Sequence, residues 1–162
     1  MSLVFLVGTA SDFFDEYFEI TRETLDDRVR LVPVDNMSTP LAKAVELAYP
    51  KWGEDGDGKF FMAVPGSPQI RELIVAEGES IGLAAGPPVI HPSASVSRST
   101  TVGVGTMIGR LVSTGFGSAV GNSCHVNRSA SIGHHCVIED FVTIAPSATL
   151  LGSSHICQGS FI

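Results

Sequence analysis

Apolar residues follow two different patterns along the chain. Through about the first half, short apolar runs alternate with segments whose apolar residues are spaced as on one face of a helix. β-type runs cover residues 3–7, 30–34 and 59–64, and a helical pattern follows each of them. Because strands that alternate with helices form βαβ units, this half predicts a small open α/β domain with a parallel sheet.

Capping residues set the expected ends of two helices. Thr39 is expected to cap the second helix, with Pro40 at its first helical position. Ser67 and Pro68 repeat this start for the third helix, and Gly78 is expected to close it.

From Ile90 onward the apolar residues follow a fixed period. Every sixth residue from there to the end is Val, Ile or Leu, and only Thr114 breaks the rule. The positions four residues after each of these carry small or β-branched residues, or in two cases Cys124 and Cys136. A period of six cannot keep one face of an α-helix, whereas it preserves the alternation of a β-strand. The second half therefore predicts a parallel β-helix with large residues inside and small ones, both cysteines included, at its corners.

These two patterns divide the chain into an α/β domain over residues 1–85 and a β-helix over residues 86–162. The repeat is still running at Ile162, where no closing helix follows it. An open end exposes strand edges, so the β-helix is expected to be truncated at the C-terminus or covered by a partner.

Composition narrows the class of protein. Hydrophobic residues make up 44% and charged residues 17%, which predicts a folded core, and the net charge of -7 argues against a nucleic-acid binder. No apolar run approaches the roughly 20 residues that span a membrane, and the N-terminus lacks the features of a signal peptide. Three cysteines without a Cys-x-x-Cys pair predict neither disulfides nor a thiolate metal site. We expect a soluble cytoplasmic protein.

The segment from Asn122 to Phe141, NSCHVNRSASIGHHCVIEDF, resembles the hexapeptide-repeat acyltransferase superfamily. Within it, the chain is similar to the NeuD/PglD-like sugar O- and N-acetyltransferases. Those proteins begin with a small Rossmann-like domain and enter a left-handed β-helix through an Ile-His-Pro-Ser-Ala junction, which this chain has at residues 90–94. The resemblance implies acetyl transfer from acetyl-CoA, as co-substrate, to an amino or hydroxyl group of a sugar, usually linked to a nucleotide. It also implies a homotrimer with acetyl-CoA between neighbouring β-helices.

The resemblance assigns roles to residues as well. The catalytic histidine of the family matches His134, whose imidazole can take a proton from the attacking amine or hydroxyl. Coils of three hexads would stack Gly152 on His134, and the family uses a glycine amide here to polarise the thioester carbonyl. His135 stands where many relatives carry a carboxylate that orients the base, so it is expected either to act with His134 or to be a residue of an exposed turn. Thr143 replaces a histidine of some relatives and is expected to donate a hydrogen bond to CoA.

Four residues are expected to contact the acceptor. Asn127 matches a polar position that lies near the acceptor in the family. Asp35, Asn36 and Ser67 follow strands of the predicted α/β sheet, where ligands of open sheets bind, although turns and helix caps use the same residue types. Relatives often have a Gly-rich turn after the first strand, whereas this chain has a single glycine, Gly8, there.

Two other functions stay open. One is a non-catalytic trimeric scaffold or nucleotide-sugar binder with the same fold, which the missing carboxylate at His135 favours. The other is a β-helix carbonic anhydrase, whose zinc needs three histidines across a subunit boundary. This chain lacks the close His-x-x-x-x-His pair of that group, so no metal is expected. His125 and His155 are expected to be surface or packing residues, and His91 a residue of the junction.

Overall fold

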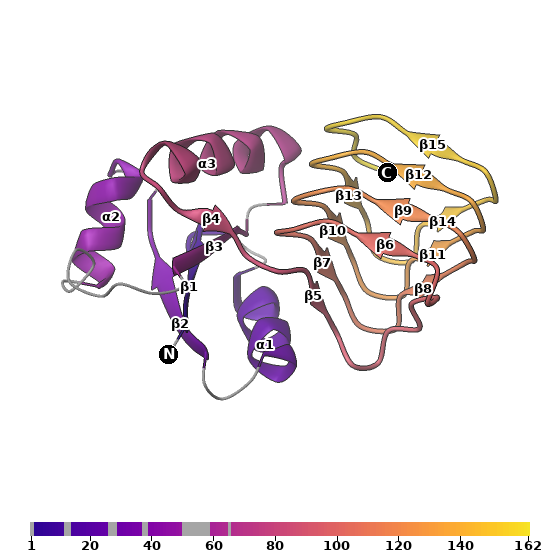
Figure 1. Ribbon diagram of the computed structural model, residues 1–162, viewed down its shortest axis with the longest axis horizontal. Coiled ribbons are helices and arrows are strands. Elements are labelled where there is room, and N and C mark those ends of the chain that lie inside the picture. The colour runs from indigo at the N-terminus through magenta and orange to yellow at the C-terminus, as the bar shows by residue number, and fades with distance from the viewer. Residues whose placement is uncertain (1, 12–13, 26–28, 37–38, 50–58, 65) are drawn as a thin grey trace.

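The structure is a computed structural model that describes residues 2–11, 14–25, 29–36, 39–49, 59–64 and 66–162. The first part holds a four-stranded parallel sheet in the order β2-β1-β3-β4. Its strands are β1 (Ser2–Val7), β2 (Val29–Val34), β3 (Lys59–Ala63) and β4 (Ala84–Ala85). Helices α1 (Phe14–Thr24), α2 (Leu41–Ala48) and α3 (Pro68–Ser80) pack around it (Figure 1). The predicted parallel α/β arrangement is therefore present, and the boundary at residue 85 stays a prediction.

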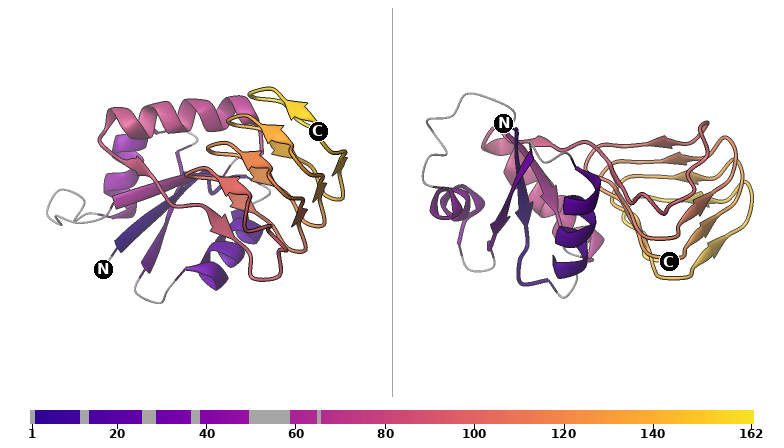
Figure 2. Two further views of the ribbon diagram at one scale, coloured as in Figure 1. Left: turned by 45° about the vertical axis from the view of Figure 1, so that its right-hand side comes forward. Right: turned by 90° about the horizontal axis from the view of Figure 1, so that it is seen from below.

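The two faces of this sheet are covered differently. Phe5 belongs to a buried cluster that the sheet forms with α2 and α3. Leu6, the next residue, points to the opposite face and joins a cluster with α1 and with Val89 and Met107 of the β-helix. Two views show α1 and the β-helix together on that side of the sheet (Figure 2). The second face of the sheet thus depends on residues far away in the sequence.

The start of α3 was predicted correctly and that of α2 was not. Ser67 is the N-cap of α3, and its hydroxyl accepts a hydrogen bond from the Ile70 N–H at 3.5 Å. In α2, Pro40 rather than Thr39 occupies the N-cap position and makes no side-chain cap. The Leu41 N–H instead donates to a carboxylate oxygen of Glu77 on α3 at 2.7 Å. A contact between helices thus satisfies an amide that we expected a local side chain to cap.

The predicted end of α3 at Gly78 was also wrong. Gly78 lies inside the helix, where a Cβ would come within 2.7 Å of the Phe61 ring. Glycine is needed there for close packing of α3 on the sheet, and the helix continues to Ser80. Gly82, with a φ of 82°, follows the true end.

The second part is a parallel β-helix of two-residue strands. Its first face is the sheet β13-β10-β7-β5, its second face β14-β11-β8, and its third face β15-β12-β9-β6. The strands are β5 (Val89–Ile90), β6 (Thr101–Val102), β7 (Met107–Ile108), β8 (Ser113–Thr114), β9 (Ala119–Val120), β10 (His125–Val126), β11 (Ser131–Ile132), β12 (Val137–Ile138), β13 (Thr143–Ile144), β14 (Thr149–Leu150) and β15 (His155–Ile156).

Stacking in the β-helix follows the predicted register. Ile108, Val126 and Ile144 pair in succession on the first face, so residues 18 apart stack and each coil holds three hexads. Ile132 is 2% and Ile144 0% exposed, and Cys124 and Cys136 are buried at corners, as the repeat predicted. Each corner also contains a residue with a positive φ, which recurs every six positions from Gly105 to Gly159. The left-handed sense of the coil stays a prediction from the resemblance.

The first face of the β-helix packs against the α/β domain. His125 is 1% exposed, its ring lies 4.4 Å from that of Tyr17 on α1, and its Nε2–H donates to the Ala63 carbonyl at 3.1 Å. Burial lowers the pKa of His125 well below its ordinary value, so the ring is neutral. Of the two alternatives for His125, packing is the correct one.

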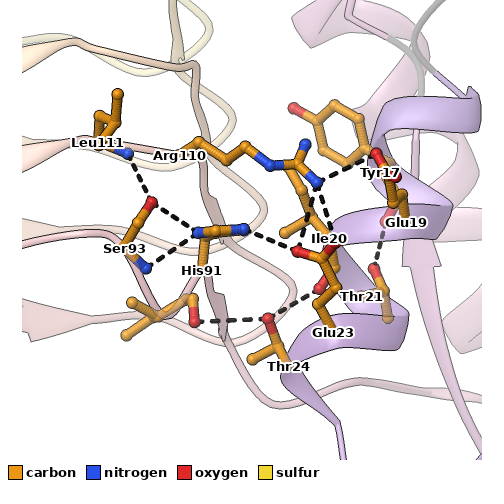
Figure 3. A network of polar contacts seen from close by, with 11 residues as sticks. Tyr17, Glu19, Ile20, Thr21, Glu23, Thr24, His91, Ser93, Arg110 and Leu111 are labelled. Carbon is orange, nitrogen blue, oxygen red and sulfur yellow. Dashed lines mark hydrogen bonds and ion pairs between the residues drawn. The ribbon is translucent and has the colours of Figure 1, made fainter.

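A polar network fixes α1 to the first two coils of the β-helix (Figure 3). The Ser93 N–H donates to Nδ1 of His91, so Nε2 carries the proton and donates to Glu23 at 2.8 Å. Arg110 donates to both Glu23 and Glu19. The hydrogen bond from His91, followed by the charge of Arg110, holds the pKa of Glu23 below its ordinary value. His91 is thus a junction residue, as expected.

Among the described residues, no helix is long and apolar enough to cross a membrane.

Candidate active site

His134 and His135 lie at one corner of the β-helix, between Ile132 of the second face and Val137 of the third. Both side chains are exposed. Because the first face packs on the α/β domain, the corner shared by the other two faces points away from that domain (Figure 1). The histidine pair is therefore open to solvent or to another molecule.

The two imidazoles contact each other directly. Their Nδ1 atoms are 3.0 Å apart, and the ring planes are inclined by 81°. One Nδ1 must carry a proton and donate the hydrogen bond, and the other Nδ1 must accept that hydrogen bond. Only when His134 donates does its Nε2 keep a lone pair, so this tautomer is the one in which His134 can act as a base. In that state His135 accepts from His134, as a carboxylate would at the same place.

Local packing explains why His135 faces His134. The His135 backbone is left-handed, with a φ of 54°, a conformation in which histidine is enriched. The ring of Phe116 meets it edge-on at 5.7 Å, and a Cβ at Gly117 would lie 3.1 Å from the imidazole. Sequence reasoning gave Phe116 no role. A coil of 18 residues stacks it on His134, whereas its ring contacts the next residue, His135.

Gly152 stacks on His134, as the coil length predicted. The Ser153 N–H donates to the His134 carbonyl at 2.7 Å, and a Cβ on Gly152 would lie 2.5 Å from Nε2 of His134. The space that glycine leaves is filled by the imidazole itself. Within the part of the chain that the structure describes, the Gly152 N–H donates to no acceptor. A proton acceptor and an amide donor thus lie side by side at an exposed corner.

Thr143 is elsewhere. Its side chain is 2% exposed, and its hydroxyl donates to the Gly66 carbonyl at 2.8 Å and accepts from Arg71 at 2.9 Å. The residue lies on the first face, inside the junction with the α/β domain. A hydrogen bond from this hydroxyl to CoA would require the junction to open, and the expected cofactor role stays a prediction.

Asn127 also lies apart from the histidine pair. It follows β10 at the corner between the first and second faces, and its Nδ2 donates to the Ile144 carbonyl at 2.8 Å. Together with Tyr17 and Arg128 it lines a narrow crevice beside α1. The structure does not bring Asn127 together with His134 in one chain.

The other predicted acceptor residues gather at the carboxyl edge of the α/β sheet. Asp35 and Asn36 follow β2, and Ser67 follows β3. Gly8, with a φ of 108°, follows β1, and its N–H donates to the Val34 carbonyl at 3.0 Å. In the order β2-β1-β3-β4 the strand order reverses between β1 and β3, and open sheets bind ligands at such a point. Gly8 and Ser67 flank it, whereas Asp35 and Asn36 lie one strand away.

No group of three or more His, Cys, Asp and Glu side chains that could hold a metal occurs within the ranges that the structure describes. His155, for its part, is a surface residue paired with Glu139 at 2.7 Å.

No family model matches the sequence, and no curated protein gives a significant match. Solved structures do match. A mutant of perosamine N-acetyltransferase from Caulobacter crescentus, in complex with CoA and GDP-perosamine, superimposes with a TM-score of 0.83 and 19% identity, over 99% of this chain and 77% of that one. WeeI from Acinetobacter baumannii AYE superimposes with a TM-score of 0.77 and 22% identity, over 96% of this chain and 74% of that one. The acetyltransferase domain of PglB from Neisseria gonorrhoeae FA1090 superimposes with a TM-score of 0.60 and 16% identity, over 100% of this chain and 91% of that one. The chain therefore has the fold of these acetyltransferases, in agreement with the resemblance of its repeat to the hexapeptide-repeat superfamily.

Proposed function

We propose that this protein is an acetyl-CoA-dependent acetyltransferase that modifies an amino or hydroxyl group of a nucleotide-linked sugar. The observation that carries the proposal is the contact of His134 with His135 and Gly152 at an exposed corner. The fold supports it, since one similar structure holds CoA together with GDP-perosamine.

In the proposed reaction, Nε2 of His134 takes the proton from the acceptor amine or hydroxyl as it attacks the thioester carbonyl. The Gly152 N–H donates to the oxygen on which negative charge develops. The new C–N or C–O bond forms, the C–S bond breaks, and the proton held by His134 passes to the CoA thiolate. Throughout, Nδ1–H of His134 donates to His135, which keeps the base in the required tautomer.

His135 makes this base different from one paired with a carboxylate. A neutral imidazole accepts the Nδ1–H bond but adds no negative charge, so it stabilises the protonated His134 less. We expect a slower transfer than in relatives that have a carboxylate at this position.

The acceptor is proposed to come from a second chain. A nucleotide at the carboxyl edge of the α/β sheet, near Gly8 and Ser67, is separated by the width of the β-helix from the His134 corner of the same chain. The side chains of Phe116, Leu151 and Val137 are 66%, 76% and 46% exposed near that corner, which suits an interface. A cyclic homotrimer would bring the two parts together. A stable monomer at micromolar concentration in light scattering would count against this arrangement.

Asp35, Asn36 and Asn127 are proposed to make weaker contacts with the acceptor, whereas no contact between Thr143 and CoA is proposed. A cytoplasmic location also stays a prediction. The alternative of a non-catalytic scaffold is favoured by one observation, the histidine at position 135 where many relatives have a carboxylate.

The proposal is tested by CoA release in the presence of acetyl-CoA and a panel of GDP-, UDP- and dTDP-linked amino sugars. Thermal melting with acetyl-CoA alone is the companion measurement, because a ligand that binds only the native state raises Tm. Transfer to at least one acceptor supports the proposal. Stabilisation by a nucleotide sugar without any response to acetyl-CoA would support the scaffold instead. Zinc in protein purified without an affinity tag would reopen the carbonic anhydrase alternative.

A further inference from the structure

Arg71 is a fully buried arginine that joins the two domains. It lies on α3 with 0% exposure. Its Nε donates to the Ser123 carbonyl at 3.0 Å, and its Nη2 to the Phe141 carbonyl at 2.7 Å. Ser123 and Phe141 occupy the same corner in successive coils, between the third and first faces. One guanidinium therefore bridges two coils of the β-helix.

The same guanidinium holds the turn before α3. Its Nη1 donates to the Gly66 carbonyl at 2.9 Å and to the Thr143 hydroxyl at 2.9 Å. Thr143 in turn donates to that same Gly66 carbonyl at 2.8 Å. Two donors, one from Arg71 of α3 and one from Thr143 of the β-helix, thus converge on the Gly66 carbonyl oxygen.

Fixing this carbonyl also fixes the amide that follows it. In a trans peptide the C=O and the next N–H point in opposite directions. Because the Gly66 C=O faces the β-helix, the Ser67 N–H faces away from it. Ser67 caps α3 and flanks the point where the strand order reverses between β1 and β3. The orientation of the turn at this point depends on Arg71 and Thr143.

We propose that Arg71 is a positioning residue, which with Thr143 sets the Gly66–Ser67 turn and so determines how the acceptor is held relative to the β-helix. This inference rests on the proposed acetyltransferase function. Burial lowers the pKa of Arg71 to about 10, so the guanidinium stays charged at neutral pH and its hydrogen bonds to neutral acceptors are charge-assisted. Lysine replaces it only in part, because an ammonium keeps the charge but lacks the planar fork that reaches three directions at once.

The test compares Arg71→Met, Arg71→Lys and Thr143→Val with the control Arg22→Met, which removes an exposed arginine of α1. The KM for the best acceptor of the panel, the KM for acetyl-CoA, kcat and Tm are measured for each. Arg71→Met should raise the acceptor KM about 10- to 100-fold, with the acetyl-CoA KM and kcat within about threefold of wild type, since the histidine corner is untouched. Arg71→Lys and Thr143→Val should raise the acceptor KM by less, and Arg22→Met should change nothing.

Thr143→Val also separates the two roles considered for that residue. A rise in the acetyl-CoA KM would return Thr143 to the CoA site and overturn the positioning role, whereas a rise in the acceptor KM supports it. If Arg71→Met does not fold, the acceptor KM values of Arg71→Lys and Thr143→Val decide whether Arg71 positions the turn. Folded variants with a wild-type acceptor KM, or with kcat lowered and both KM values unchanged, would mean that Arg71 is merely structural. If the wild type itself transfers to no acceptor, the proposed function fails and this inference with it, whereas an active wild type confines the failure to Arg71.

Discussion

Replacing Gly152 by alanine should damage catalysis far more than folding. The new Cβ would lie 2.5 Å from Nε2 and 2.6 Å from Cε1 of His134, whereas ordinary contacts begin near 3.4 Å. The imidazole must therefore retreat by about 1 Å or turn to another rotamer. Because the clash is with the end of an exposed side chain, the retreat is easy and the backbone need not move.

The size of the effect follows from this displacement. A misplacement of about 1 Å in a reacting group can cost about 100-fold in rate, so Gly152→Ala should lower kcat by about that factor. The free energy of unfolding should change by less than about 1 kcal/mol, since no buried contact is lost. The amide donor is unchanged, so the acetyl-CoA KM should stay close to that of the wild type.

CoA release under saturating substrates gives kcat, and urea unfolding gives the stability. The matched control is Gly86→Ala, in which the new Cβ meets Met62, Phe60 and Phe61 at 3.5 to 3.6 Å, an ordinary contact. It should keep both kcat and stability. A folded Gly152→Ala protein with kcat within about threefold of wild type would refute the reasoning, because His134 would then not need its present place over Gly152.

Three further outcomes are expected. His134→Ala should lower kcat by about 10²- to 10⁴-fold with acetyl-CoA binding nearly intact, and His135→Ala should lower it less; the opposite order, in kcat measured across pH, would move the base by one residue. Ile132→Ala and Ile144→Ala should each cost about 2 to 5 kcal/mol in urea unfolding, and a loss below about 0.5 kcal/mol would contradict the inward register. The pKa of Glu23 is lowered from 4.5 in the folded protein, so its bond to His91 stabilises the fold above that pH and stops doing so as the pH falls below it. Thermal melts should therefore show a steeper acid decline of Tm for the wild type than for Glu23→Gln, and equal slopes would exclude this contribution.

Much of the fold could be predicted from the sequence because its signals are local and periodic. The period of six keeps Ile132 and Ile144 inside. With the three hexads per coil that the resemblance implied, the stacking of Gly152 on His134 follows by counting residues. Ser67 followed by Pro68 marked the start of α3, because cap and proline act within one turn of helix.

Only the tertiary structure decided what depends on contacts between distant segments. Glu77 of α3 binds the first amide of α2, and the Phe61 ring requires glycine at position 78 inside α3. Packing of distant segments, rather than spacing along the sequence, brings these residues together. Arg71 and Gly66 bind the Thr143 hydroxyl inside the domain junction, away from the expected CoA site. No local pattern encodes these pairings. The first two depend on how α2 and α3 pack on the sheet, and the third depends on how the β-helix docks on the α/β domain. Sequence thus determined the coil and its histidine corner, while docking determined which polar side chains remain available for a ligand.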